Sequence, residues 1–376
     1  MISNFADQIY LVKDRTRRRL TDIRALLLYN PSSIKPHDHR TYRNYYLVRN
    51  KEPYILVLME SFEDMAVFSE AFGRDKEAVI LKFLPWSHES VEAVKHVRYF
   101  YKQHQEQFPK HQVHILCNTE KEKRLLSVIT PHVHYINQNA LIDERLFPLA
   151  AREPREFDVA YNSRLVRIKR QHLLTEMDGR IALFGDTSNK IDWDYFNVLR
   201  RTIPHARMLY YSHKPYLKDI PQYENIAYAA YEALASRLNQ AYTGAILSRA
   251  EGANYASAEY LLCGLPVVST YNIGGRDVFF DDRYCRTVLP NPHKIKTAVE
   301  ELIAGKTEPA FIREETLKKM EPHRQRFREL LFNIHRQFAI PINKEDYWRS
   351  VYVNKMLLFG SKFPETLNAA LQIKSA

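Results

Sequence analysis

Short apolar runs alternate with longer amphipathic stretches in the first half of the sequence. The apolar runs predict strands at Tyr54–Met59, Ala78–Leu84, Val113–Cys117 and Val133–Ile136. The stretches between them have helical periodicity, as at Ser90–Gln103 and Glu120–Ile129. Alternation of this kind predicts a parallel sheet with helices on both faces, which is an α/β fold.

A second series of the same kind follows a polar stretch at Ala151–Glu156, the linker candidate. It predicts strands at Phe157–Tyr161, Arg180–Phe184, Ala206–Tyr211, Gly244–Ser248 and Pro266–Ser269. It predicts helices at Lys169–Met177, Trp193–Thr202, Tyr231–Ala241, Ala256–Cys263, His293–Ala304, Arg324–Phe338 and Glu345–Leu358. We therefore expect two Rossmann-like domains, 1–150 and 151–340, facing across a cleft, and a helical segment 341–376 that packs back on the first domain.

Composition agrees with two globular domains and gives no sign of a metal or disulfide framework. The chain has 376 residues, 45% of them apolar, and only three cysteines. Their wide spacing favours reduced, buried thiols and a cytoplasmic protein, and no metal-binding motif occurs. The sequence contains no signal-peptide pattern and no apolar run of about 20 residues, so we expect a soluble or peripheral protein.

The net charge of +11 favours an anionic partner. Basic residues are densest near the N-terminus, at Lys13, Arg15, Arg17, Arg18 and Arg19. One interpretation is the solvated face of an amphipathic helix; another is peripheral contact with an anionic membrane that carries a lipid-linked acceptor. An alternative of another class is a basic nucleic-acid-binding protein. The chain contains no recognised nucleic-acid motif, so we expect no nucleic-acid partner.

The segment Ser248–Asp282 contains the clearest chemical pattern. A loop that opens with Glu251-Gly252 leads into a helix, and Gly264, followed by Leu265-Pro266, ends that helix. A helix N-terminus presents unpaired N–H groups to an anionic or oxygen-rich ligand. Glu259 lies eight residues after Glu251, so the two carboxylates can reach opposite ends of one extended ligand.

This segment resembles the E-x7-E motif of retaining GT-B glycosyltransferases of family 4. The resemblance rests on EGANYASAEYLLCGLPVVST and the Gly274-Gly275 loop that follows. It implies that Glu251 contacts the donor sugar, that Glu259 contacts the nucleotide ribose, and that the loop backbone approaches the sugar diphosphate. The loop residues concerned are Gly252, Ala253, Asn254 and Tyr255. The alternative is that both glutamates cap and solvate a surface helix.

A second segment, Phe157–His172, resembles the family element whose Arg and Lys grip the donor diphosphate. Arg164 and Lys169 have the corresponding spacing. Fixed cations stabilise the negative charge that grows on a departing nucleoside diphosphate. Ser163 and Arg170 replace two family glycines, and Arg167 and Arg170 are expected to face solvent. The alternative is ordinary surface charge.

Weaker matches complete the resemblance. Gly185 ends a strand where the family has a glycine-containing turn, and His88 follows a predicted strand where the family has a cleft histidine that bonds the donor sugar; a surface histidine is the alternative. Arg276 departs from the pattern and suggests either binding of an acidic acceptor or a phosphate, or pairing with Asp277 or Asp281.

The resemblance implies a metal-independent, retaining transfer of a sugar from a nucleotide diphosphate sugar to a glycan or lipid-linked acceptor, in surface polysaccharide biosynthesis. No cofactor is expected beyond the nucleotide sugar. The rivals with the same fold are a nucleotide-sugar epimerase, a sugar phosphorylase and an inactive partner subunit.

Overall fold

The computed structural model describes residues 5–35, 42–149, 155–186, 193–211, 223–225 and 231–372. The chain forms two compact units, which we call unit 1 (residues 1–141 and 323–376) and unit 2 (residues 142–322). These bounds differ from the predicted ones. Arg313 of unit 2 donates to the carbonyl oxygens of Glu144 and Phe147, and Phe327 packs into a core of unit 1.

The sheet of unit 1 has the order β13-β1-β2-β3-β4-β5. Its strands are β1 (Tyr42–Arg49), β2 (Tyr54–Leu58), β3 (Ala78–Phe83), β4 (His111–Cys117), β5 (Val133–Tyr135) and β13 (Leu358–Lys362). Strands β2 to β5 are parallel, whereas β1 runs antiparallel to β2 and to β13. The C-terminal strand therefore completes a sheet that the N-terminal strands begin.

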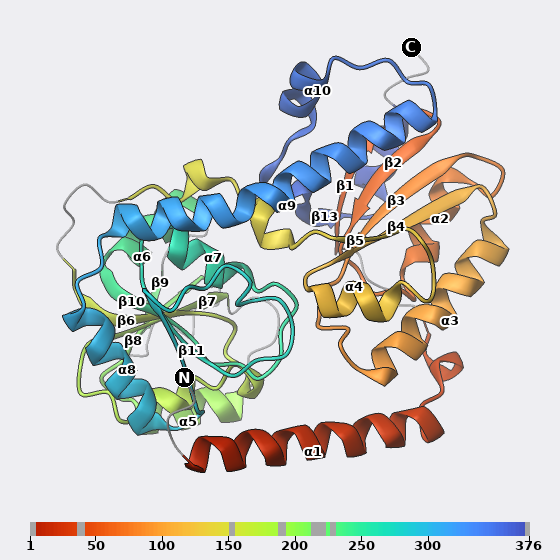
Figure 1. Ribbon diagram of the computed structural model, residues 1–376. Coiled ribbons are helices and arrows are strands. Elements are labelled where there is room, and N and C mark those ends of the chain that lie inside the picture. Colours follow the sequence, from red (N-terminus) through yellow and green to blue (C-terminus); the bar gives the residue numbers. More distant parts are fainter. Residues whose placement is uncertain are drawn as a thin grey trace. The chain divides into compact units, whose positions relative to one another are not determined.

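Helices cover both faces of this sheet (Figure 1). The helices with residues in unit 1 are α1 (Phe5–Leu28), α2 (Met65–Phe72), α3 (Val91–Gln107), α4 (Glu120–Leu126), α9 (Pro309–Gln337), α10 (Lys344–Val351) and α11 (Glu365–Gln372). One core lies between the sheet and α2 and α3, and a second lies between the opposite face and the part of α9 that follows Pro322. Helix α4 begins with a capping box formed by Thr119 and Glu122.

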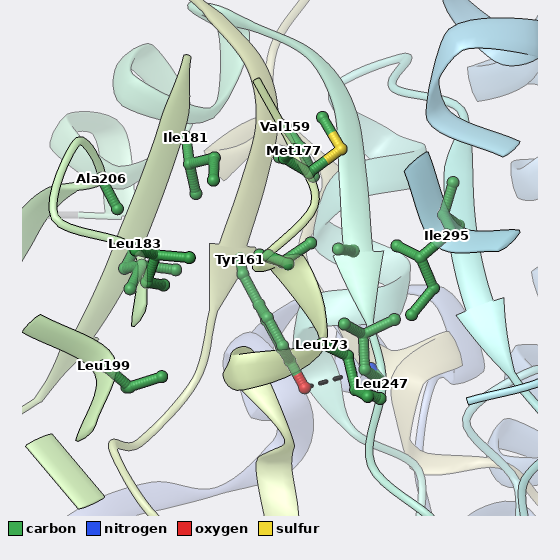
Figure 2. Close-up of a cluster of buried hydrophobic side chains, with 14 of the residues drawn as sticks. Val159, Tyr161, Leu173, Met177, Ile181, Leu183, Leu199, Ala206, Leu247 and Ile295 are labelled. Carbon is green, nitrogen blue, oxygen red and sulfur yellow. Dashed lines mark hydrogen bonds between the residues drawn. The ribbon is translucent and has the colours of Figure 1, made fainter. Parts of the chain in front are cut away.

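The sheet of unit 2 has the order β12-β11-β10-β6-β7-β8-β9 and is parallel throughout. Its strands are β6 (Phe157–Asn162), β7 (Ile181–Asp186), β8 (Arg207–Tyr211), β9 (Tyr223–Asn225), β10 (Ala241–Ile246), β11 (Val267–Thr270) and β12 (Cys285–Val288). Its helices are α5 (Trp193–Thr202), α6 (Tyr231–Asn239), α7 (Tyr255–Leu262) and α8 (Pro292–Ala304). Helices α5 and α8 cover the core of one face (Figure 2), and α6 and α7 contact β10.

The nine predicted strands and most predicted helices are present, with ends shifted by a few residues. The predicted helix Lys169–Met177 is wrong: two short 3-10 helices, Arg167–Lys169 and Gln171–Leu174, meet at Arg170, whose left-handed backbone (φ 59°) interrupts them. The predicted helix Glu345–Leu358 is too long, since α10 ends at Val351 and the chain then turns into β13.

All three cysteines are free and buried, as the spacing predicts. Burial raises the pKa of the thiols of Cys117, Cys263 and Cys285. Within the described ranges, no helix combines the length and the apolar character that a bilayer crossing requires.

Candidate donor site at the switch point of unit 2

The strand order of unit 2 has a switch point between β6 and β10. From β6 the chain proceeds outward through β7, β8 and β9, and then returns to the other side of β6 with β10. Loops that follow adjacent strands on the two sides of such a point diverge and leave a crevice at the carboxyl ends of the strands, where α/β proteins bind ligands. The predicted donor segments follow β6 and β10, so they flank this point.

Lys169 and Glu251 form an ion pair that joins these two segments. The Lys169 ammonium donates to Oε1 of Glu251, and both side chains are almost fully buried. Burial lowers the pKa of Lys169, and the Glu251 carboxylate opposes this effect. The arrangement holds one cation and one anion side by side, largely out of water, where each acts more strongly on a ligand than it would at the surface.

Tyr161 fixes the backbone on both sides of the ion pair. Its side chain extends from β6, and its hydroxyl accepts a hydrogen bond from the Leu247 amide, 3.0 Å away (Figure 2). The same hydroxyl donates to the Lys169 carbonyl oxygen. The Tyr161 hydroxyl therefore links the segment after β6 to the segment after β10, and this link holds the ion pair in a fixed geometry.

Helix α7 carries the second predicted glutamate. Glu259 is 3% exposed, and its Oε2 accepts from the Asn162 side chain at 3.2 Å, at the end of β6. Tyr260 is fully buried, and its hydroxyl bonds the Asn162 amide. Because Glu251 and Glu259 are both buried, the alternative of a solvated surface helix is wrong for this segment.

Two glycines give α7 its position. Gly264 ends the helix with φ +72°, as predicted, and a Cβ there would lie 2.5 Å from the Cβ of Pro309. Gly244 of β10 lies under Tyr260, and a Cβ there would lie 2.4 Å from the Tyr260 ring. Glycine at position 244 lets the helix approach the sheet closely enough for Tyr260 to reach β6.

The predicted loop Gly252–Tyr255 leads directly into α7. Asn254 precedes the helix with positive φ (56°), and its carbonyl oxygen accepts from the Ser257 amide at 3.1 Å and from the Ser257 hydroxyl at 2.8 Å. Gly252 accepts from the Gly275 amide at 2.7 Å, and Glu251 donates its amide to Ile273 at 3.0 Å. The loop that contains Gly274 and Gly275 is thus hydrogen-bonded to the loop that contains Glu251 and Gly252. Ala253 is buried, and Tyr255 is the first residue of α7.

Arg276 has a structural role that its sequence position did not reveal. It is fully buried, and its guanidinium donates to Ser248 Oγ at 2.7 Å, to Ser269 Oγ at 3.0 Å and to the carbonyl oxygens of Ser248 and Thr270. Asp281, suggested as its partner, instead accepts from Arg283 and Lys319. Arg276 holds together the ends of β10 and β11, because a planar fork of donors can reach both.

Two further arginines, Arg164 and Arg170, belong to the same predicted donor segment as Lys169. Arg164 is exposed, and its charge lowers the pKa of Lys169. Arg170 was expected to face solvent, but it is only partly exposed, and its Nη1 is buried without a hydrogen-bond partner in the described part of the chain. A buried guanidinium nitrogen in this state favours an anion as its partner. Gly185 is the penultimate residue of β7, and residues 187–192, which follow this strand, are outside the described residues.

His88 belongs to unit 1, whereas the other predicted site residues belong to unit 2. It follows β3; its Nδ1 lies 2.7 Å from the Trp86 carbonyl oxygen, and its backbone amide donates to Glu122. Burial lowers the pKa of His88 to about 4, so the ring is neutral at neutral pH. The side chain is partly buried beside Phe62, which differs from the alternative of a freely exposed surface histidine.

Sequence reasoning missed a buried charged cluster at the ends of β2 and β3. Lys82 is fully buried and donates to the carbonyl oxygens of Glu60 and Phe83, and burial lowers its pKa to about 7. Arg43 lies 3.3 Å from Asp64, and both are fully buried. The available signal was the run of carboxylates in ESFED directly after a predicted strand.

The fold of the chain resembles the folds of several solved structures, and this resemblance defines its architecture. Anabaena Alr3699/HepE in complex with UDP-glucose matches with a TM-score of 0.52 and 15% identity, over 74% of this chain and 78% of HepE. Sucrose-phosphate synthase from Thermosynechococcus elongatus matches with a TM-score of 0.52 and 15% identity, over 77% of this chain and 74% of the synthase. The chain has the GT-B fold.

TarM matches this GT-B chain with a TM-score of 0.51 and 13% identity, over 73% of the chain; the chain spans only 54% of TarM. No family model and no curated protein matches the sequence. At these identities the resemblance defines the architecture of the GT-B chain, while its chemistry has to be argued from its own residues.

Proposed function

We propose that this protein is a retaining glycosyltransferase that moves a sugar from a nucleoside diphosphate sugar to a glycan or lipid-linked acceptor, in surface polysaccharide biosynthesis. The observation that carries the proposal is the buried Lys169–Glu251 pair at the switch point of unit 2. Two structural facts add to it: Arg164 and Arg170 bring further positive charge to the same loop, and Glu259 lies on α7 beside the end of β6.

The diphosphate is the group that the cations fit. Lys169 supplies a point charge, and Arg164 and Arg170 supply planar donors for phosphate oxygens. In this proposal the backbone of the loop Gly252–Tyr255, which leads into α7, approaches the sugar diphosphate. In this proposal Lys169 lies between the diphosphate and Glu251, and Glu251 contacts the sugar. Glu259 contacts the ribose.

The proposed reaction is a front-face transfer. The bond from the anomeric carbon to the diphosphate oxygen breaks, and the acceptor hydroxyl oxygen forms a new bond on the same face. The departing diphosphate oxygen takes the proton of that hydroxyl, so the products are a glycoside and a nucleoside diphosphate. Arg164 and Lys169 stabilise the charge that develops on the leaving group, and we propose that no metal ion is required.

The first test is a thermal-shift screen of the full chain with UDP, GDP, ADP and CMP. A nucleotide that binds only the folded state raises the melting temperature. UDP heads the list because the HepE structure contains UDP-glucose. We expect Arg164→Ala to lose most of this shift, whereas Arg201→Ala, the same change at an exposed arginine of α5, retains it.

The second test is turnover of the matching nucleotide sugar with a panel of acceptors, with and without EDTA. Glu251→Gln is expected to abolish turnover, and Glu300→Gln, at an exposed position on α8, to retain it. Product NMR that shows an inverted anomeric centre would refute retention. Turnover that requires phosphate, or that proceeds without an acceptor to an epimer, would instead assign a phosphorylase or an epimerase.

A further inference from the structure

Helix α1 packs on unit 1 through one face only. Partly or fully buried residues recur at helical spacing along that face, at Leu11, Asp14, Arg18, Asp22 and Ala25. The helix lies beside α3 (Figure 1). The Val91 amide donates to Asp22 at 3.1 Å, and Lys95 donates to the carbonyl oxygens of Ala25 at 3.2 Å and Leu26 at 3.1 Å.

The opposite face of α1 is exposed and mostly apolar, and between Ile9 and Leu27 Thr16 is its one polar residue. Its large side chains are Ile9, Val12, Leu20, Ile23 and Leu27, with 39%, 60%, 63%, 55% and 75% of their surface exposed. At 3.6 residues per turn they fall within an arc of about 80°. We call these five residues the apolar stripe. Helix α1 supplies seven of the thirteen exposed large hydrophobic residues found in the described part of the chain, so the exposure is concentrated here.

Basic residues flank the apolar stripe on both sides. On the helical projection Lys13, Arg17 and Arg24 fall on one side, and Arg15 and Arg19 on the other; all are exposed. The acids Asp14 and Asp22 lie on the packed face, where Asp14 pairs with Arg18 and Asp22 bonds α3. From residue 8 to residue 28, therefore, none of the exposed side chains of α1 is acidic.

We propose that the apolar stripe of α1 docks into the interface of an anionic lipid bilayer. A helix with an apolar stripe between rows of Lys and Arg lies in the bilayer surface, with its apolar side chains among the acyl chains and its cations at the anionic headgroups. A second copy of α1 is poorly suited to cover the apolar stripe, because the basic rows of the two helices would repel each other. This inference does not depend on the proposed glycosyltransfer.

The test is cosedimentation of the full chain with vesicles of phosphatidylcholine alone or with 40% phosphatidylglycerol. We expect at least roughly tenfold stronger binding to the anionic vesicles, because each Lys or Arg near such a surface adds to the attraction, and we expect binding to weaken as salt is raised. Leu20→Glu should abolish it. Val128→Glu, which introduces the same charge at a residue 78% exposed elsewhere in unit 1, should reduce it far less.

The outcomes distinguish membrane binding from self-association through the apolar stripe. Both variants change exposed residues, so their circular dichroism and melting temperatures should match those of the unchanged chain. Loss of binding in Leu20→Glu alone supports the proposal. Absent binding, equal binding by both variants, or equal binding to neutral and anionic vesicles overturns it. So does a dimer, measured by light scattering without lipid, that Leu20→Glu dissociates, since a second copy would then cover the stripe.

Discussion

The Lys169–Glu251 pair allows the strongest quantitative prediction about the proposed donor site. Its side chains are 10% and 7% exposed, so each partner neutralises a charge that water cannot reach easily. Removing one partner of a buried pair costs about 3–5 kcal/mol, whereas an exposed pair contributes only about 0.2–1 kcal/mol. We expect Lys169→Ala and Glu251→Gln each to lower the free energy of unfolding by about 3 kcal/mol.

The double variant Lys169→Met, Glu251→Leu removes both charges and fills the space with apolar groups. It should recover most of the lost stability, because replacing a buried pair by apolar residues is often neutral or stabilising. It should still lack the nucleotide-induced rise in melting temperature. This variant would then be stable but unable to bind the nucleotide, which distinguishes the role of the pair in stability from its role in ligand binding.

The stability loss caused by Glu251→Gln should also change with pH in a defined direction. Burial lowers the pKa of Lys169, and the Glu251 carboxylate raises it, so removing that carboxylate lowers the folded-state pKa further. Between this value and the unfolded value of about 10.4 the unfolded chain binds more protons, and stability rises with pH. The deficit of Glu251→Gln should therefore shrink from pH 7 to pH 10 in urea denaturation. Losses below about 1 kcal/mol in both single variants would refute the buried pair.

Three further predictions concern the surroundings. Gly244→Ala should cost about 1–3 kcal/mol in urea denaturation, because its Cβ would lie 2.4 Å from the Tyr260 ring; an unchanged midpoint would contradict this. Arg276→Met should cost about 3–5 kcal/mol, since its hydrogen bonds at the ends of two strands are lost; Arg276→Lys should restore only part. Burial lowers the pKa of His114 to about 3 and that of His134 to about 4, so the unfolded chain binds more protons between pH 6.5 and 4. Stability should fall as pH falls through this window, and a slope unchanged in His134→Gln would contradict this.

Local patterns were sufficient for much of the fold. The apolar runs located the nine predicted strands, and Trp193–Thr202 was bounded correctly because its apolar face is periodic and it lies between two strands. Gly264 ended α7 as predicted because positive φ is a local requirement that glycine meets. Glu251 and Glu259 could be proposed as a pair because their spacing along one loop and helix is also local.

Long-range partners decided what the sequence analysis missed. Strand β1 was not predicted, and it pairs with β13 more than 300 residues later in the sequence. The first half of α9 was missed because Pro322, normally a helix stop, lies inside a continuous helix. The hydrogen-bond partners of Arg276 come from strand ends on either side of α7, so sequence proximity to Asp281 pointed to the wrong contact.

The discontinuous composition of unit 1 has a consequence for synthesis on the ribosome. Residues 142–322 form a continuous unit, so unit 2 has all its residues as soon as this stretch has emerged. The sheet of unit 1, although made first, waits for Phe327, Leu331 and Met356 to cover the face that carries Ile55 and Val79. The half of the protein that is translated earliest is thus completed last, and a nascent chain stalled after residue 322 exposes an apolar sheet to chaperones.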